Sequence, residues 1–207
     1  MNNDSLLPSI GLGFTFILAA VLLVSFFRLR VKLRNARGLM EKMATTDELT
    51  GILNRKQLMT RFEEEFHEHK RQKSEVACIL VDLDHLKKIN ETYGHSAGDS
   101  VLKEFARVTK SFIRIYDVFG RYGGEEFMIL IPFTGLPQAM TLAERIRKTI
   151  AEKFTVKSGS GDHIRLTVSL GVTSLREGDE SIDVIAKRAD EALTKAKQAG
   201  RNRAELA

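Results

Sequence analysis

Apolar residues recur three and four positions apart along much of the chain, which is the spacing of one face of an α-helix. The clearest example follows Asn54, where Leu58, Phe62 and Phe66 share one face. Asn54 is a favourable N-cap residue, and Gln57 stands at the capping-box position. The charged stretch after this face predicts a solvated helix end. The same spacing predicts further helices over residues 86–91, 98–113, 136–153 and 181–198.

Patterns typical of β-strands lie between these helices. An apolar run over residues 75–82 ends in an acidic residue and predicts a buried strand. Apolar residues on both sides of Gly123 and Gly124 predict a β-hairpin over residues 115–132. Strict alternation predicts one more strand, through Ile164, Leu166, Val168, Leu170 and Val172. Helices and strands in this order predict a two-layer α/β sandwich of the α+β kind.

The longest apolar segment, residues 6–27, contains no charged side chain. As a helix rising about 1.5 Å per residue it would reach about 33 Å, enough to cross a hydrocarbon core of about 30 Å. A cleaved signal peptide would begin with positive charge, whereas residues 1–5 carry only Asp4. Because positive charges follow the segment, the positive-inside rule places residues 1–5 outside and the remainder in the cytoplasm. We therefore expect a single-pass protein of a bacterial-type inner membrane.

Charge and cysteine content narrow the classes of function. The formal net charge is +5, and five basic residues between Arg28 and Arg37 account for most of the excess. Residues 38–207 are close to neutral, so the charge distribution predicts no nucleic-acid-binding surface. A single cysteine, Cys78, excludes an intrachain disulfide.

A connector over residues 28–46 links the apolar segment to the rest of the chain. Its apolar positions repeat at alternating intervals of four and three, which is typical of a coiled-coil seam. The seam begins in the lower half of the apolar segment and consists of Leu22, Phe26, Leu29, Leu33, Ala36, Met40 and Met43. We expect two chains to pair along it as a parallel dimer. The alternative is a single amphipathic stalk, since Gly38 weakens the helix by roughly 1 kcal/mol.

The candidate chemistry centres on the run Gly123-Gly124-Glu125-Glu126-Phe127. Glycines allow the backbone to approach a ligand closely, and carboxylates are the ligands that hard cations prefer. Asp82 ends the predicted buried strand and would add another carboxylate. The alternative for the five residues alone is an ordinary hairpin turn with solvated glutamates.

Several further motifs stand in a fixed order around this run, and together they resemble the GGDEF family, the diguanylate cyclases. The resemblance covers roughly residues 45–207 and implies a catalytic domain over residues 47–207. The implied fold is a central, mostly antiparallel sheet surrounded by helices, similar to the nucleotidyl cyclase and polymerase palm. The motifs are Asp47-Glu48-Leu49-Thr50-Gly51, Asn54-Arg55, Gly94-His95, Gly98-Asp99, Gly123 to Phe127, Ala196-Lys197 and Gly200-Arg201-Asn202-Arg203.

The resemblance implies that two GTP molecules are joined into cyclic di-GMP with release of two pyrophosphates. The metal, Mg²⁺ or Mn²⁺, is expected on Asp82, the carbonyl group of Leu83, and Glu125. Glu125 or Glu126 would help to deprotonate the attacking 3′-hydroxyl, and the sequence leaves open which one does so. Asp84 points to the same face of the strand as Asp82, and we expect it to support the metal ligands.

The resemblance also implies residues that bind the nucleotide. Asn90 and Asp99 match positions that recognise guanine, and an amide with a carboxylate suits its hydrogen-bonding edge. The alternative is that Asn90 and Asp99 cap a turn and a helix. Substrate contacts are further expected from Lys87, Gly123, Gly124, Lys197 and Arg201, with the three cations holding phosphate.

Arg114 and Asp117 match an Arg-x-x-Asp site at which the family binds its own product. Arginine can bind phosphate through two parallel hydrogen bonds and stack on guanine. The resemblance therefore implies a homodimeric, membrane-anchored cyclase that its product inhibits. The alternative is a catalytically silent receptor or scaffold that binds cyclic di-GMP through Arg114 and Asp117.

Overall fold

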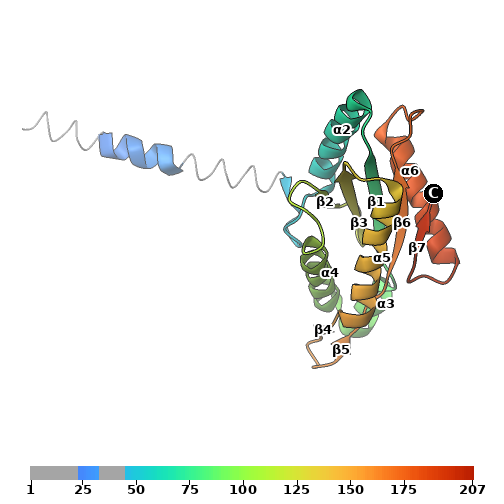
Figure 1. The fold of residues 1–207 in the computed structure, drawn as a ribbon. Helices are drawn as coiled ribbons and strands as arrows, with labels where there is room; N and C mark the ends of the chain where they lie inside the picture. The colour runs from blue at the N-terminus through green and yellow to red at the C-terminus, as the bar shows by residue number, and fades with distance from the viewer. Residues whose placement is uncertain (1–22, 33–44) are drawn as a thin grey trace, which may run out of the picture. The chain divides into compact units, whose positions relative to one another are not determined.

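The structure is a computed structural model that describes residues 23–32 and 45–207. Residues 23–32 form a helix with exposed side chains, blue in Figure 1, and belong to a unit separate from Thr45–Ala207. None of the described helices has the length and apolar character of a membrane span. Most of the predicted span 6–27 and of the connector 28–46 lies outside the described residues, so both remain predictions.

A five-stranded sheet forms the centre of the second unit, in the order β2-β3-β1-β6-β7 (Figure 1). The β1, β3 and β2 strands pair antiparallel, as do β1 and β6, whereas β7 runs parallel to β6. The mostly antiparallel sheet expected from the family resemblance is therefore present. The strands are β1 (Val76–Leu83), β2 (Val118–Arg121), β3 (Glu126–Pro132), β6 (Val168–Ser174) and β7 (Ala204–Leu206).

The β1 strand is buried along its whole length because both of its faces are covered. Successive side chains of a strand point to opposite faces, so β1 contributes to two cores. Ala77, Ile79 and Val81 pack in one cluster, and Cys78 and Leu80 pack in the other. An almost continuous apolar sequence is what a strand between two cores requires.

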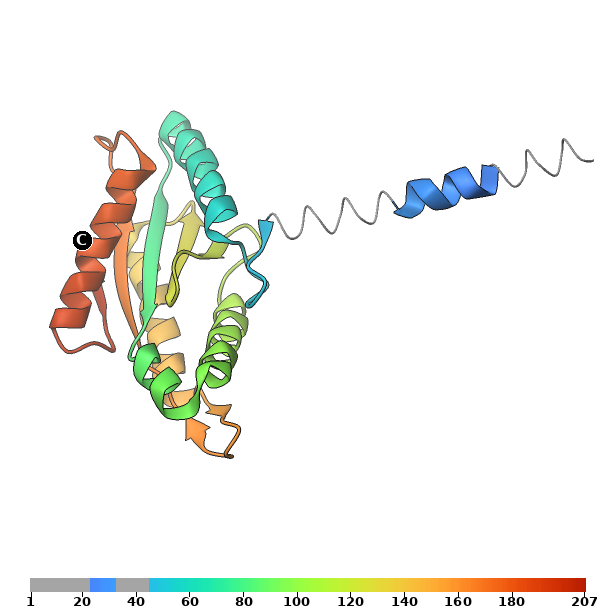
Figure 2. The ribbon, with the colours of Figure 1, turned by 180° about the vertical axis from the view of Figure 1, so that it is seen from behind.

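Helices cover both faces of the sheet (Figure 2). This confirms the sheet surrounded by helices that the family resemblance implied, and it makes three layers rather than the two predicted from the pattern alone. One face packs against α2 and α6, and the other packs against α4 and α5, with α3 beside α4. The two-layer expectation was wrong because helical spacing does not reveal which face of a sheet a helix covers. The helices are α2 (Arg55–Gln72), α3 (Leu86–Tyr93), α4 (His95–Lys110), α5 (Leu136–Lys153) and α6 (Ile182–Gln198).

The α2 helix confirms the expected cap and one-sided core. The Asn54 side chain accepts a hydrogen bond from the backbone N–H of Gln57 at 2.9 Å. The predicted apolar face of α2 is buried. The charged end of the helix is less solvated than expected, because His69 is only 1% exposed and its ring packs on Phe133 at 4.5 Å between centroids.

The strand predicted over residues 164–172 is interrupted. His163–Ile164 forms β5, which pairs with β4 (Val156–Lys157) in a separate two-stranded sheet. The backbone then enters the main sheet as β6. The β7 strand, only three residues long, was not predicted because so short a segment has no measurable period.

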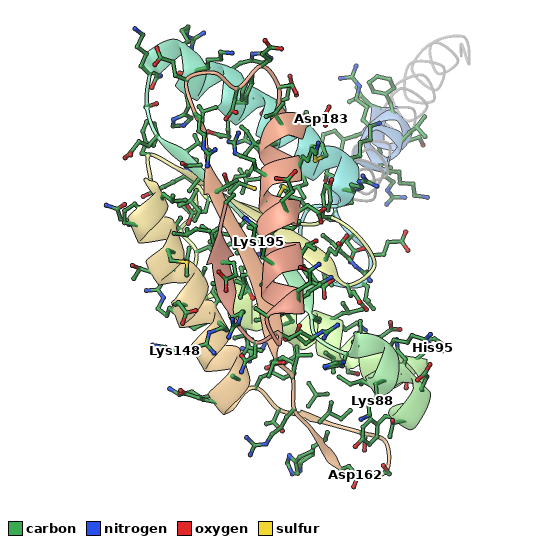
Figure 3. All side chains as sticks on the ribbon, turned by 90° about the vertical axis from the view of Figure 1, so that its right-hand side faces the viewer. Lys88, His95, Lys148, Asp162, Asp183 and Lys195 are labelled. Atoms are coloured by element: carbon green, nitrogen blue, oxygen red, sulfur yellow. The ribbon has the colours of Figure 1, made fainter. Side chains whose placement is uncertain are left out.

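A close contact holds α6 against the sheet. A Cβ atom on Gly171 of β6 would lie 2.0 Å from the carbonyl oxygen of Ala189 and 2.5 Å from the backbone nitrogen of Leu193. Only glycine therefore allows α6 to approach β6 this closely. Figure 3 shows the course of α6 between the labelled residues Asp183 and Lys195, and Lys197 lies in its last turn.

Candidate active site

Three acidic side chains meet where β1 ends beside the β2–β3 hairpin. Asp82 is 5% exposed, and the antiparallel register places it opposite Glu126. The backbone N–H of Leu83 donates to the carbonyl oxygen of Glu125 at 3.2 Å, which holds the hairpin tip beside the strand end. The sequence-predicted residues Asp82, Leu83, Glu125 and Glu126 are therefore brought together.

The hairpin tip is held in place by a residue that the sequence analysis did not single out. The Arg121 guanidinium donates to the carbonyl oxygen of Gly124 at 2.7 Å and forms a salt bridge with Asp47 at 3.1 Å. A Cβ atom on Gly123 would lie 2.5 Å from Oε2 of Glu126, whereas one on Gly124 would meet open space. Gly123 thus gives the Glu126 carboxylate its room.

Burial and mutual repulsion shift the titration of these acids. Burial raises the pKa of Asp82, which Lys197 opposes through an Nζ–Oδ2 distance of 2.7 Å. Burial also raises the pKa of both Glu125 and Glu126, and the neighbouring Asp82 raises each of them further. Lys197 lowers the pKa of both glutamates in part. The site therefore concentrates negative charge in a partly desolvated position, with Lys197 in direct contact with it.

This donor set fits a divalent cation that is shared with a nucleotide. Among the described residues, no group of three or more His, Cys, Asp or Glu side chains is arranged to enclose a metal by itself. Mg²⁺ commonly takes one or two protein carboxylates and completes its coordination with phosphate oxygens and water. Asp82 and Glu125, with the carbonyl group of Leu83, are residues of that kind.

The helices α3 and α4 carry the two predicted guanine-binding residues, Asn90 and Asp99. In Figure 3, α3 is marked by the label Lys88 and α4 by the label His95. Oδ1 of Asn90 is buried and has no hydrogen-bond partner among the described residues. It lies where a side chain of Gly98 would otherwise be, 1.8 Å from the ideal Cβ position. Asp99 is exposed in the first turns of α4.

The three predicted phosphate-binding cations are placed differently. Lys197 contacts Asp82 directly, and the positive charge of Arg201 also acts on the Asp82 carboxyl. Lys87 is instead on the exposed side of α3, where its ammonium group lies 3.8 Å from Glu91. The structure therefore joins two of the three cations to the acidic cluster.

Arg114 and Asp117 form a second, separate cluster in the turn after α4. The backbone N–H of Arg114 donates to Oδ2 of Asp117 at 2.6 Å, and its guanidinium donates to the Tyr116 hydroxyl at 2.8 Å. Oδ1 of Asp117 is buried with no hydrogen-bond partner in the described part of the chain. Burial raises the pKa of Asp117, although Arg114 opposes this shift.

Two cavities, of about 780 and 280 Å³, adjoin this cluster and are both lined by Arg114 and Asp117. The exposed side chains of Tyr116 and Phe133 lie at the same place. None of the acids at the end of β1 lines either cavity. The structure therefore offers a binding surface that is distinct from the acidic cluster.

The sequence of the chain is similar to a known protein family and to several known proteins. Residues 44–203 match the family described as "Diguanylate cyclase, GGDEF domain". The chain is 42% identical over 165 residues to diguanylate cyclase DgcP of Pseudomonas aeruginosa, a match covering 79% of this chain and 24% of DgcP. It is 40% identical over 168 residues to diguanylate cyclase A of Treponema denticola, covering 80% of this chain and 45% of that protein. The chain thus spans about a quarter to a half of the length of these relatives.

A solved structure is similar over most of its length. The crystal structure of the coiled coil and GGDEF domain of DgcB from Caulobacter crescentus, in complex with c-di-GMP, matches with a TM-score of 0.84 and 30% identity. The match covers 92% of this chain and 99% of that one.

Proposed function

The chain belongs to the GGDEF family of diguanylate cyclases, and we propose that it joins two GTP molecules into cyclic di-GMP with the aid of a divalent metal. The observation that carries the proposal is the meeting of Asp82 with Glu125 and Glu126 beside Lys197. A solvated hairpin turn does not require buried acids next to a cation. Acids whose pKa values are shifted in this way cluster at functional sites.

In the proposed reaction, the 3′-hydroxyl of one GTP attacks the α-phosphate of the other in line. An O3′–P bond forms, the bond from the α-phosphorus to the bridging oxygen breaks, and pyrophosphate leaves. Two such steps close the ring and release two pyrophosphates. When bound at Asp82, Leu83 and Glu125, Mg²⁺ or Mn²⁺ supplies charge that stabilises the phosphate oxygens.

The proton of the attacking hydroxyl goes to a glutamate. The raised pKa of Glu125 and of Glu126 makes each a stronger base than an ordinary carboxylate once it is ionised. Glu125 is also proposed as a metal ligand, so Glu126 is the better placed of the two to accept the proton. Gly123 leaves the space in which its carboxylate lies.

The remaining contacts bind and orient the nucleotide. We assign Lys197 and Arg201 to the phosphate chain because both act on the acidic cluster. Lys87, on the exposed side of α3, is proposed to reach the phosphates only when nucleotide is bound. The unpartnered Asn90 oxygen and the exposed carboxylate of Asp99 are proposed to recognise guanine.

Two chains are needed because one acidic cluster handles one GTP, whereas the product contains two nucleotides. We propose that the segment 6–27 anchors each chain in a bacterial inner membrane and that the connector 28–46 pairs two chains as a homodimer. Each cytoplasmic domain would then present one GTP to the other, and their encounter would control the rate.

Arg114 and Asp117 support a second proposal, that the product inhibits the enzyme. Both line the 780 Å³ cavity, and Oδ1 of Asp117 is buried with no hydrogen-bond partner among the described residues. The same observation supports the alternative of a silent cyclic di-GMP receptor. The two differ at the acidic cluster, which a receptor does not need.

The direct test is to incubate the full chain, purified in lipid nanodiscs, with GTP and Mg²⁺ and to identify the product by mass spectrometry. We expect cyclic di-GMP from the native chain. Folded, dimeric chain that binds cyclic di-GMP but makes none would establish the receptor alternative instead.

A further inference from the structure

Asp84, at the end of β1, is a buried carboxylate to which the reaction above assigns no role. It is 3% exposed. Its Oδ1 accepts a hydrogen bond from the Ser169 hydroxyl at 2.7 Å, and its Oδ2 accepts one from the Thr167 hydroxyl at 2.7 Å. Oδ2 also accepts the backbone N–H of Asn202 at 3.1 Å. Both oxygens are therefore engaged by donors from the protein itself.

The contact to Asn202 joins residues 118 positions apart and reaches into the loop between α6 and β7. Three successive residues of this loop have positive φ angles, which are 108° at Gly200, 61° at Arg201 and 46° at Asn202. Residues other than glycine keep this conformation only where their surroundings hold them in it. The Asp84 carboxylate is one such restraint.

A second restraint acts on the same residue from another side. The Arg147 guanidinium, on α5, donates to the Asn202 carbonyl oxygen at 3.3 Å and to its side-chain Oδ1 at 3.1 Å. Asp84 thus holds the backbone N–H of Asn202, and Arg147 holds its carbonyl and side-chain oxygens. The residue immediately before it, Arg201, is left with its side chain exposed.

Arg201 is the residue whose placement this arrangement determines. Its charge acts on Asp82, and the proposed function, on which this inference rests, assigns it to the phosphates of GTP. Asp84 follows Asp82 by two residues, immediately after β1, so the proposed metal-binding acid and the restraint on the loop lie close together at the end of one strand. The Asn202 N–H links the loop to Asp84, while the backbone N–H of Arg201 donates to the carbonyl oxygen of Ala196 at 3.0 Å and ties the loop to α6 as well.

We propose that Asp84 is a positioning residue that fixes the loop 199–203, and with it Arg201, for contact with the triphosphate of GTP. It acts through Arg201, since its hydrogen bonds to Ser169, Thr167 and the Asn202 N–H join it to β6 and to the loop. A group that orients direct ligands in this way commonly changes affinity by about 10- to 100-fold when it is removed.

The test is a double-mutant cycle on nucleotide binding by the full chain. The probe is the α,β-methylene analogue of GTP with Mg²⁺, since its carbon bridge prevents pyrophosphate release, and the readout is isothermal titration calorimetry. Asp84→Ala is expected to weaken binding about 10- to 100-fold. In an Arg201→Ala background, Asp84→Ala is expected to lower the affinity for the analogue by less than about twofold, because the residue through which Asp84 acts is gone.

Two further variants separate positioning from folding. Ser169→Ala removes the hydrogen bond to Oδ1 but leaves Oδ2 and Asn202 in contact, and is expected to keep native affinity within about twofold. Asp84→Asn keeps the shape and an acceptor for the Asn202 N–H, and is expected to lose less affinity than Asp84→Ala. If the alanine variant does not fold, the asparagine variant takes its place in the cycle.

The possible outcomes are distinguishable. If Asp84→Ala lowers the affinity for the analogue equally with and without Arg201, the inference is overturned and the proposed function stays intact. Native binding by Asp84→Ala would do the same. Failure of the native chain to bind the analogue would instead contradict the proposed function itself, and the positioning role would fall with it.

Discussion

At the level of single residues, the contact between Gly98 and Asn90 predicts the effect of Gly98→Ala on stability and on GTP binding. Replacing a helical glycine by alanine normally stabilises a helix by about 1 kcal/mol. A Cβ atom at position 98 would, however, lie 1.8 Å from Oδ1 of Asn90 and force that side chain to move. We therefore expect Gly98→Ala to fold at least nearly as stably as the native chain.

The same variant should bind GTP about 3- to 10-fold more weakly, which corresponds to the loss of a hydrogen bond worth about 1 kcal/mol. Calorimetry gives the affinity, and urea denaturation gives the stability. Ser96→Ala, at an exposed position of the same helix, is the control and should leave GTP affinity unchanged. Native GTP affinity in Gly98→Ala would show that Asn90 does not contact the base.

The acidic cluster predicts how stability varies with pH. Burial, and then the charge of Asp82, raise the pKa of Glu125 above its usual value of 4.5. The folded state therefore holds this proton more tightly than the unfolded chain does. The protonated Glu125 carboxyl therefore contributes to the free energy of unfolding fully below pH 4.5, and this contribution is lost as the pH rises through the raised pKa.

Glu125→Gln removes this dependence because its amide does not ionise. We expect the variant to melt at a higher temperature than the native chain near pH 7 and at a similar temperature below pH 4.5, measured without metal. Glu177→Gln, at an exposed position between β6 and α6, is the control and should show no such crossover. A native chain that melts higher than Glu125→Gln near neutral pH would contradict the assignment.

At the scale of elements, the sequence located the helices well and the layers poorly. The helix predicted over residues 136–153 is confirmed as α5, because amphipathic spacing and Pro137 mark it locally. The side of the sheet on which a helix packs depends on chain crossovers that no local pattern records. The break between β5 and β6 was missed because the alternating residues continue through it.

In the candidate site too, locally marked residues were predictable and long-range contacts were not. Asp82 and the hairpin glutamates were predictable, since each ends or begins a recognisable strand pattern. The salt bridge of Arg121 with Asp47 was not, because it joins the end of β2 to a residue 74 positions earlier in the chain. Asp84 was expected to support the metal ligands, but its link to Asn202 needed the folded chain to be seen.

The contact of α6 with the sheet predicts the effect of Gly171→Ala. The added Cβ would meet backbone atoms of α6 at 2.0 and 2.5 Å, which cannot rotate away as a side chain would. We expect a loss of about 1–3 kcal/mol or more in unfolding free energy, measured by urea denaturation. Gly178→Ala, where the added atom meets open space, is the matched control.

The same displacement should move Lys197, which α6 carries, away from Asp82. The folded fraction of Gly171→Ala is therefore expected to bind GTP more weakly as well. A variant as stable as the native chain would show that α6 does not approach β6 as closely as the structure has it.

Across the whole molecule, two clusters of side chains have different proposed tasks. The acidic cluster is proposed to make cyclic di-GMP, and the cluster of Arg114 and Asp117 is proposed to sense it. Coupling between two such sites is reciprocal in binding free energy. Product bound at the second cluster should therefore weaken productive engagement of GTP at the first.

This coupling predicts that Arg114→Ala relieves inhibition. Loss of a charged hydrogen-bond donor should raise the inhibition constant for cyclic di-GMP by about 10- to 100-fold. The measurement is the rate of pyrophosphate release against added cyclic di-GMP. Lys110→Ala, which removes another cation lining the same cavity, is the control and should stay inhibited. Unchanged inhibition in Arg114→Ala would place the sensor elsewhere.

The acids at the end of β1 are proposed to support the joining of two GTP molecules. The most direct test is to measure cyclic di-GMP and pyrophosphate together, with the full native chain and with Asp82→Asn, in lipid nanodiscs with Mg²⁺. We predict two pyrophosphates for each cyclic di-GMP from the native chain, and a rate at least about 100-fold lower from a folded Asp82→Asn. Native rates from Asp82→Asn, or pyrophosphate released without cyclic di-GMP, would contradict the account.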